Sequence, residues 1–238
     1  MAFALVQQAG AVGSSPGANN ATVTLAPTGA GNALIVVASY ATDNPGTTDL
    51  TSVTLGGSGT GFAAQARYND LSYPNFTLTY WANFGIAGGQ TSLAVSASGA
   101  SGYDVQVNAY EVSGGLSSLD KTVFNAAYAT STNWTSTATG TTTEADEFVL
   151  GTVAAYNNNG PAFTITGPTS PWANAGQLTI NTQYSLLSGY QISAAQSAFT
   201  YAGTANVSGG GLNYTAGVAT FKDGAPPATG SLLMAWPP

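Results

Sequence analysis

Short runs of β-branched and aromatic residues, separated by clusters of Gly, Pro, Asn and Asp, recur along almost the whole of this chain. Helical periodicity is almost absent. Within Phe76 to Trp81 the residues alternate with the period of two that is typical of a strand. The continuous apolar run Ala33 to Thr42 predicts a central strand that is buried on both faces. This punctuation predicts an all-β fold, a two-sheet antiparallel sandwich.

The second half of the chain repeats the order of events in the first half. The run Glu147 to Tyr156 matches the apolar run Ala33 to Tyr40, and Trp172 matches Phe62 at the start of a later strand. Other expected strands in the first half are Ala2–Gln8, Ala21–Leu25, Leu50–Leu55, Phe62–Tyr68 and Val105–Val112. The repetition predicts two similar halves, residues 1–115 and 116–238.

Two such halves could be tandem sandwiches or the two Greek keys of one jelly roll. The segment between them, Gly115 to Thr143, contains large apolar residues that need burial: Val123, Phe124, Tyr128 and Trp134. A segment that must itself be buried favours one joint core. We therefore interpret residues 1–238 as a single jelly-roll-like sandwich, with residues 223–238 as a C-terminal tail or edge strand.

The charge content excludes several classes of function. The 238 residues include three cations, ten carboxylates, no His and no Cys, and the formal net charge is −7. Without His or Cys the chain cannot build a Ser-His-Asp or Cys-His nucleophile or a zinc site with those ligands. Three cations cannot neutralise a row of phosphates, so we expect no nucleic-acid partner. The longest apolar stretch is too short to span a bilayer, so we expect no membrane insertion.

Several segments together resemble a family of β-sandwich domains found in phage virion proteins and bacterial surface proteins. The segments are Gly31–Val37, Leu78–Ala82, Tyr110–Gly114 with Ser118–Asp120, Glu144–Gly151, Gly189–Ser193 and Gly217–Lys222. The resemblance covers roughly Phe3 to Lys222 and consists of strand and turn patterns. It implies a jelly-roll-like sandwich on an exposed surface, and it implies no catalytic set.

Two loops offer candidate ligand sites. Asp43 and Asp49 could supply oxygen ligands to calcium, although their loop is also rich in ordinary turn formers and its spacing matches no known calcium loop. Tyr73 and Trp172 are the natural candidates for stacking on a sugar. The match of Trp172 with Phe62 favours a core position for Trp172, which leaves Tyr73 as the better exposed candidate. We expect no cofactor.

The carboxylates are the last possible basis for catalysis, since glycosidases need only two of them. Glu144, Asp146 and Glu147 cluster before a predicted buried strand, and Glu111 lies inside another strand. We interpret the cluster as a solvated turn and Glu111 as a hydrogen-bonded sheet residue. Lys121 and Lys222 also raise the hypothesis of an intramolecular Lys–Asn isopeptide bond, for which the sequence gives no geometry.

The C-terminal run is the strongest candidate for an assembly contact. Leu232, Leu233, Met234 and Trp236 form an apolar segment beyond a Pro-Pro break. It could fold back as an edge strand beside Ala2–Gln8, or it could add a strand to a neighbouring subunit.

The sequence thus predicts a non-enzymatic structural protein of an extracellular assembly. A phage virion protein of the particle surface, in capsid decoration or tail, is the first interpretation. Its expected partners are other assembly subunits, copies of itself included. The alternative is a carbohydrate-binding adhesion module of an extracellular or bacterial cell surface, with host surface glycans as partners.

Overall fold

Every regular element in the described part of the chain is a β-strand. The computed structural model describes residues 2–13, 19–42, 49–69, 75–98, 105–128, 132–157, 162–180, 183–207 and 212–224. The first half contains β1 (Ala4–Val12), β2 (Asn20–Thr24), β3 (Ala33–Thr42), β4 (Asp49–Leu55), β5 (Ala63–Asn69), β6 (Asn75–Phe84), β7 (Ser92–Ser98) and β8 (Gln106–Ser113). The second half contains β9 (Leu116–Tyr128), β10 (Asn133–Thr135), β11 (Asp146–Asn157), β12 (Thr164–Thr166), β13 (Ala173–Asn174), β14 (Leu178–Ile180), β15 (Tyr184–Ala194), β16 (Ala202–Asn206) and β17 (Leu212–Asp223). No helix in these residues could cross a membrane.

The strands form two antiparallel sheets in each half of the chain. In the N-terminal half, an inner sheet has the order β1-β8-β3-β6-β5 and an outer sheet the order β2-β7-β4. In the C-terminal half, the inner sheet has the order β13-β15-β11-β17-β9, with β14 also paired to β15, and the outer sheet the order β10-β16-β12. Once β9 is equated with β1, β11 with β3 and β17 with β8, the two halves have the same strand order.

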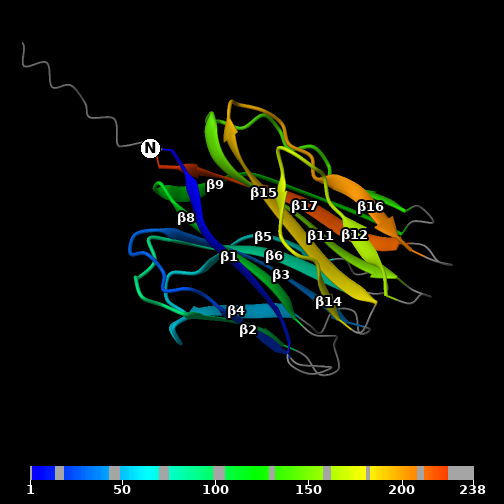
Figure 1. The fold of residues 1–238 in the computed structure, drawn as a ribbon, viewed down its shortest axis with the longest axis horizontal. Coiled ribbons are helices and arrows are strands. Elements are labelled where there is room, and N and C mark those ends of the chain that lie inside the picture. The colour runs from blue at the N-terminus through cyan, green and yellow to red at the C-terminus, as the bar shows by residue number, and fades with distance from the viewer. Residues whose placement is uncertain are drawn as a thin grey trace, which may run out of the picture.

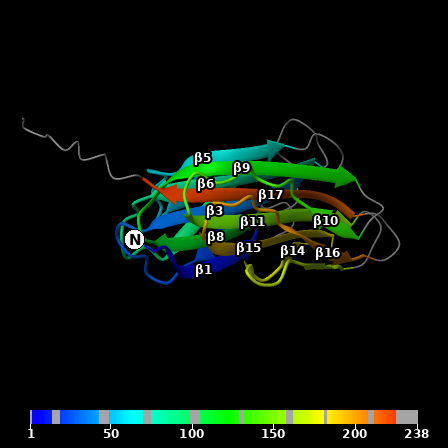
Figure 2. The ribbon, with the colours of Figure 1, turned by 90° about the horizontal axis from the view of Figure 1, so that it is seen from above.

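The four sheets stack so that the two inner sheets face each other (Figures 1 and 2). A central core, which includes Tyr80, Tyr110, Phe148 and Phe221, fills the space between the inner sheets. An N-terminal core lies between the first inner and outer sheets, and a C-terminal core lies between the second pair. Each half therefore has its own sandwich, and the central core joins the two.

The third strand of each half shows why the inner sheets are buried on both faces. Along β3, Ala33, Ile35 and Val37 point into the central core, whereas Leu34, Val36 and Ala38 point into the N-terminal core. Along β11, residues such as Phe148 and Leu150 enter the central core, while Val149 and Val153 enter the C-terminal core. The strand predicted from the run Ala33 to Thr42 is confirmed with the same bounds.

The prediction of an all-β antiparallel sandwich with two similar halves is confirmed. The sequence interpretation assigned one pair of sheets to the whole chain, whereas the structure has one pair for each half. Counted within each half, the first, eighth, third and sixth strands form one sheet, and the second, seventh and fourth strands form the other. This is the strand order of a jelly roll, except that the fifth strand joins the inner sheet. The sequence interpretation treated one joint core and two separate sandwiches as alternatives. The molecule has both, and it therefore has four sheets instead of two.

The segment Gly115 to Thr143, expected to be buried between the halves, supplies the first two strands of the second sandwich. Phe124 on β9 packs against the central core and Val123 against the C-terminal core, as the apolar content required. Trp134 on β10 is fully buried, and its Nε1 donates a hydrogen bond to the carbonyl oxygen of Thr204 at 3.1 Å.

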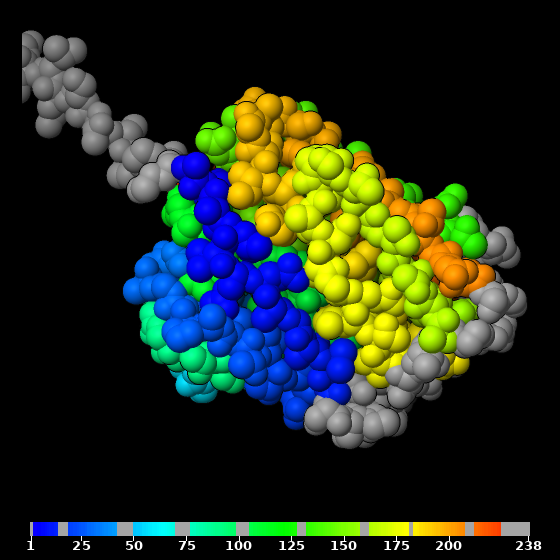
Figure 3. Space-filling view, viewed as in Figure 1, coloured from blue at the N-terminus to red at the C-terminus, as the bar shows by residue number. Residues whose placement is uncertain are grey.

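The strand β1 is an edge strand on the surface of the molecule. It pairs with β8, and no other strand of the described residues pairs with its outer edge. It crosses the face between the N-terminal and C-terminal halves in dark blue (Figure 3) and lies near β14. The end of β17 lies at the same end of the molecule as the start of β1 (Figure 1), since β17 Asp223 pairs with Leu116 and β1 Ala4 with Ser113.

Candidate functional site

Several of the residues singled out in the sequence lie outside the described residues. Tyr73, Asp43 and the C-terminal run Leu232, Leu233, Met234 and Trp236 belong to segments that the structure does not describe. The backbone of Asp49 begins β4, but its side chain is not described. Among the described residues, no group of three or more potential metal-binding side chains comes together.

Trp172 precedes β13 and takes part in an aromatic cluster of the C-terminal core. Its ring centroid lies 4.9 Å from that of Tyr201 in an edge-on arrangement, and Tyr201 in turn lies 5.1 Å from Trp134. Trp172 is half-buried, and Phe62, its counterpart in the first half, packs against the N-terminal core. This placement supports the packing role that the match with Phe62 indicated.

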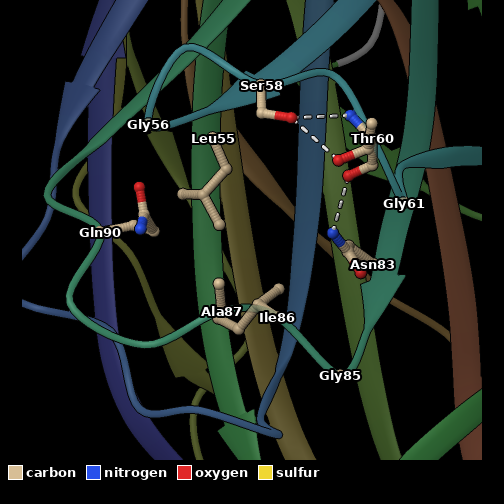
Figure 4. Close-up of a pocket in the computed structure, with 10 residues that line it drawn as sticks. All are labelled: Leu55, Gly56, Ser58, Thr60, Gly61, Asn83, Gly85, Ile86, Ala87 and Gln90. Atoms are coloured by element: carbon tan, nitrogen blue, oxygen red, sulfur yellow. Dashed lines mark hydrogen bonds between the residues drawn. The ribbon is translucent and has the colours of Figure 1, made fainter.

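A hollow of about 530 Å³ opens between the turns that follow β4 and β6 in the N-terminal half (Figure 4). This volume is in the range of roughly 300–1,000 Å³ that is common for small-molecule sites. Its lining carries no charged side chain and consists of hydroxyls, amides, glycines and aliphatic groups: Leu55, Gly56, Ser58, Thr60, Gly61, Asn83, Gly85, Ile86, Ala87 and Gln90.

Hydrogen bonds within the turn after β4, and between that turn and β6, stabilise the lining of this hollow. The hydroxyls of Ser58 and Thr60 lie 2.8 Å apart, and the Asn83 side-chain amide donates to the Thr60 carbonyl oxygen at 3.3 Å. Gly61 has a φ of 88°, and a Cβ there would come within 3.0 Å of the Asn83 side chain. The buried side chains of Leu55 and Ile86 add aliphatic surface. The result is a neutral hollow in which hydrogen-bonding groups lie on both sides of the aliphatic groups (Figure 4).

The second half places an aromatic residue where the first half places Gln90. The backbone N–H of Gln90 donates to the Thr28 hydroxyl at 3.0 Å, and the backbone N–H of Phe199 donates to the Thr139 hydroxyl at 2.9 Å. These matching bonds equate Gln90 with Phe199, which packs against the C-terminal core. The amide that lines the hollow is therefore specific to the N-terminal half.

A second polar cluster joins the first and last strands of the C-terminal half. The Asp120 side chain, only 4% exposed, accepts hydrogen bonds from the Thr143 backbone N–H at 2.8 Å and from the Thr143 hydroxyl at 2.6 Å. The Lys222 ammonium lies 3.4 Å from Asp120 Oδ1 and donates to the Thr143 hydroxyl oxygen at 2.8 Å. Lys121 lies 3.9 Å from the same carboxylate oxygen.

Glu147 completes this cluster from the start of β11 and is fully buried. Burial raises the pKa of Glu147, hydrogen bonds from Thr220 and Glu144 oppose the rise, and the neighbouring Asp120 charge adds to it. Burial also acts to raise the pKa of Asp120, but hydrogen bonds from Thr143 and Glu147 outweigh it, so the net shift is downward. The two neighbouring carboxyl groups are thus shifted in opposite directions, with the pKa of Glu147 raised and that of Asp120 lowered.

The interpretation of Glu144, Asp146 and Glu147 as a solvated turn is right for two of the three residues. Glu144 and Asp146 are exposed, but Glu147 is buried, because the alternation of β11 turns its side chain inward beside Asp120 and Thr220. Asp120 and Thr143 were not among the candidate site residues of the sequence analysis. A lone Asp in a strand gives no signal until the fold brings Thr143 and the lysines to it.

Glu111 is a hydrogen-bonded sheet residue, as expected. Its carboxyl accepts hydrogen bonds from the Gln7 side chain at 2.5 Å, from the Gly29 backbone N–H at 2.7 Å and from the Asn32 side chain at 2.6 Å. It lies in the N-terminal inner sheet, whereas Glu147 lies in the C-terminal inner sheet. The two carboxyl groups that could have formed a glycosidase pair have separate sets of partners.

Comparison with known proteins adds no assignment: no family model, no curated protein and no solved structure matches the chain.

Proposed function

We propose that this chain is a non-enzymatic structural subunit of an extracellular assembly, of the phage virion surface class that its strand and turn motifs resemble. Copies of the chain associate by adding a strand to the outer edge of β1. The jelly-roll pair joined by a central core supplies a rigid block, and the outer edge of β1 supplies the contact.

The observation that carries this proposal is the exposed apolar edge of β1. Among the described residues, the large hydrophobic side chains that are exposed are Val6, Val12 and Ile192. Two of these three lie on β1, at 51% and 38% exposure. An edge strand offers unpaired N–H and C=O groups to another chain, and exposed valines on that strand favour an apolar partner.

The apolar run near the C-terminus has the chemistry of that partner. It follows Gly224, where an added Cβ would lie 2.8 Å from the Ser117 hydroxyl, at the end of the molecule where β1 begins. Every ladder in the described sheets is antiparallel, and a run antiparallel to its own β1 would have to start well along that strand. The seven residues between Gly224 and Leu232 reach at most about 25 Å, which limits where such a run could start. The β1 edge of a neighbouring copy sets no such limit, and this favours the run as an assembly arm.

The oligomeric state of engineered chains tests the proposal. We expect the full chain to form concentration-dependent oligomers in light scattering, and we expect removal of residues 225–238 to leave a folded monomer. The double variant Val6→Lys/Val12→Lys should also be monomeric, because charges on an edge strand block strand addition. Ile192→Lys is the matched control, an exposed apolar residue away from β1, and should still associate. Oligomers that survive both β1 changes, or a wild-type chain that stays monomeric, would contradict the proposal.

The neutral hollow favours a second candidate function, a glycan-binding module. Amide and hydroxyl groups beside aliphatic surface match the hydroxyl and C–H faces of an uncharged sugar. A glycan array probed with the full chain should then give hits that weaken with Asn83→Ala and disappear with Gln90→Phe, which copies the second half. Gln65→Ala, an amide change outside the hollow, should leave the hits unchanged. An array without hits, or hits indifferent to Gln90→Phe, would remove this candidate.

A further inference from the structure

The Asp120 cluster brings together the groups needed to make an amide bond between two side chains. A primary amine, Lys222 Nζ, lies 3.4 Å from a carboxyl oxygen of Asp120. A second carboxyl group, Glu147, is fully buried beside that pair. Two Thr143 donors are already bonded to the Asp120 carboxyl group.

We propose that Lys222 and Asp120 form an intramolecular isopeptide bond, with Glu147 as the proton-transfer group. The Lys222 nitrogen bonds to the Asp120 carboxyl carbon, and one Asp120 C–O bond breaks. The departing oxygen leaves as water, with two protons that come from the Lys222 ammonium and pass through Glu147. An ammonium and a carboxylate thus become one neutral amide and one water, and no oxidant or other co-reactant is needed.

The surroundings of Asp120 suit each step of this condensation. The Thr143 backbone N–H, 2.8 Å from Oδ2, is placed to stabilise the negative oxygen of the tetrahedral intermediate. Glu147 lies beside Asp120 and has a raised pKa, which suits a group that passes a proton to the departing oxygen. Asp120 is almost fully covered, which limits attack of water on the same carbon.

The geometry selects Lys222 over Lys121. Lys222 Nζ is the closer amine, and its hydrogen bond to the Thr143 hydroxyl oxygen fixes it next to the carboxyl group. Lys121 Nζ is 3.9 Å from the same oxygen, and no Thr143 contact holds it. Lys222 lies on β17 and Asp120 on β9, so the bond would join the last and first strands of the C-terminal half. The sequence hypothesis of a Lys–Asn bond is thereby replaced by a Lys–Asp bond.

Intact mass spectrometry of the full chain under denaturing conditions tests the proposal. We expect the wild-type chain to be lighter than its sequence by one water, with a fragment that links the peptides containing Asp120 and Lys222. Lys222→Arg keeps the charge and should fold, but it should show the full sequence mass. Glu147→Gln should form the bond about 100-fold more slowly, as for loss of a general acid–base group. Lys121→Arg is the matched control and should still lose one water.

The outcomes separate the alternatives. A linked fragment in the wild-type chain that disappears in Lys222→Arg supports the proposal. The full sequence mass after prolonged incubation of folded wild-type protein overturns it, and the pair is then an ion pair only. A link that uses Lys121 overturns the assignment to Lys222. Thermal melting of each variant, compared with the wild-type chain, shows whether its fold is kept.

Discussion

The two halves of this molecule share one strand order but tie their first strand to their last strand with different chemistry. In the N-terminal half, Gln7 on β1 donates to Glu111 on β8, and Glu111 also accepts from the Gly29 backbone N–H. In the C-terminal half, Asp120 on β9 accepts from Thr143 and faces Lys222 on β17. Each half thus uses one buried carboxyl group to bind the turn that leads into its third strand.

The difference lies in which strand supplies the carboxyl group and what accompanies it. In the N-terminal half the last strand supplies it, and its partners are two amide side chains and a backbone N–H. In the C-terminal half the first strand supplies it, and its neighbours are two lysines and a second carboxyl group. In both halves the turn before the third strand donates hydrogen bonds to a buried carboxyl group. The neighbours of that carboxyl group differ between the halves, and among the described residues only in the C-terminal half do they include amines that could react with it.

The first strands of the two halves differ in the same way. β9 is half-buried along most of its length, and its Phe124 ring lies 5.6 Å from the Tyr68 ring and 5.7 Å from the Tyr80 ring of the other half. β1 presents Val6 and Val12 to solvent. Both strands lie at an edge of their inner sheet, but β9 uses its aromatic side chain to join the halves, whereas β1 exposes large apolar side chains.

Separation of the two halves should have the largest effect on folding. Residues 1–115 and 116–238, expressed alone, each expose one face of the central core, including large side chains such as Tyr110 and Phe148. We expect both fragments to aggregate and to bind a hydrophobic dye, because exposed apolar faces of this kind associate. Two soluble monomers with sharp melting transitions would show that the central core is dispensable.

Loss of the Glu111 carboxyl group should have the next largest effect. Glu111→Ala leaves the Gly29 backbone N–H and the Asn32 side chain without their acceptor in a buried site. We expect the free energy of unfolding in urea to fall by about 3 kcal/mol. Glu144→Ala, the loss of an exposed carboxylate, is the control and should change it by less than about 0.5 kcal/mol. Equal effects of the two substitutions would mean that Glu111 does not hold its turn.

The pH dependence of the C-terminal cluster should give a smaller effect. Because burial raises the pKa of Glu147 above its ordinary value of 4.5, the folded state binds this proton more tightly than the unfolded chain does. The stability that results is full below about pH 4.5 and is lost as the pH rises through the folded pKa. In the Lys222→Arg background, we therefore compare the free energy of unfolding of Glu147→Gln with that of its parent. The difference should shift in favour of Glu147→Gln as the pH rises from about 4 to about 8, because the parent loses stability and Gln does not titrate. Urea unfolding at both pH values measures this, and a difference that is independent of pH would contradict it.

Much of the fold could be predicted from the sequence because turn-forming residues and apolar runs determine strand positions through local effects. The bounds of β3 follow from the run Ala33 to Thr42, and the buried role of Trp134 follows from its size. The strand β9 was not predicted, because Ser117, Asp120 and Asn125 interrupt its apolar alternation. That strand is stabilised by its pairing with β17, and pairing between distant segments leaves no local signal.

The candidate sites could be predicted less well than the fold. Gly56 and Gly61 line the hollow, and their lack of a side chain leaves space there. A glycine in a turn does not by itself predict a cavity. Glu147 was misjudged because its position in the sequence is that of a turn residue, whereas the first inward position of β11 buries it. Which carboxyl groups meet which lysines is a property of strand register, and the sequence alone does not fix register.

Hydrogen exchange of β1, compared with β9, tests the proposed assembly most directly. At high protein concentration we expect the amides of the β1 segment Ala4–Val12 to become more protected in the full chain, because a strand from a neighbouring copy pairs with its outer edge. The amides of β9 should not change, and the chain without residues 225–238 should show no gain in β1. Protection of β1 that does not depend on concentration would mean that the run folds back on its own chain. Protection that is the same with and without residues 225–238 would contradict the account.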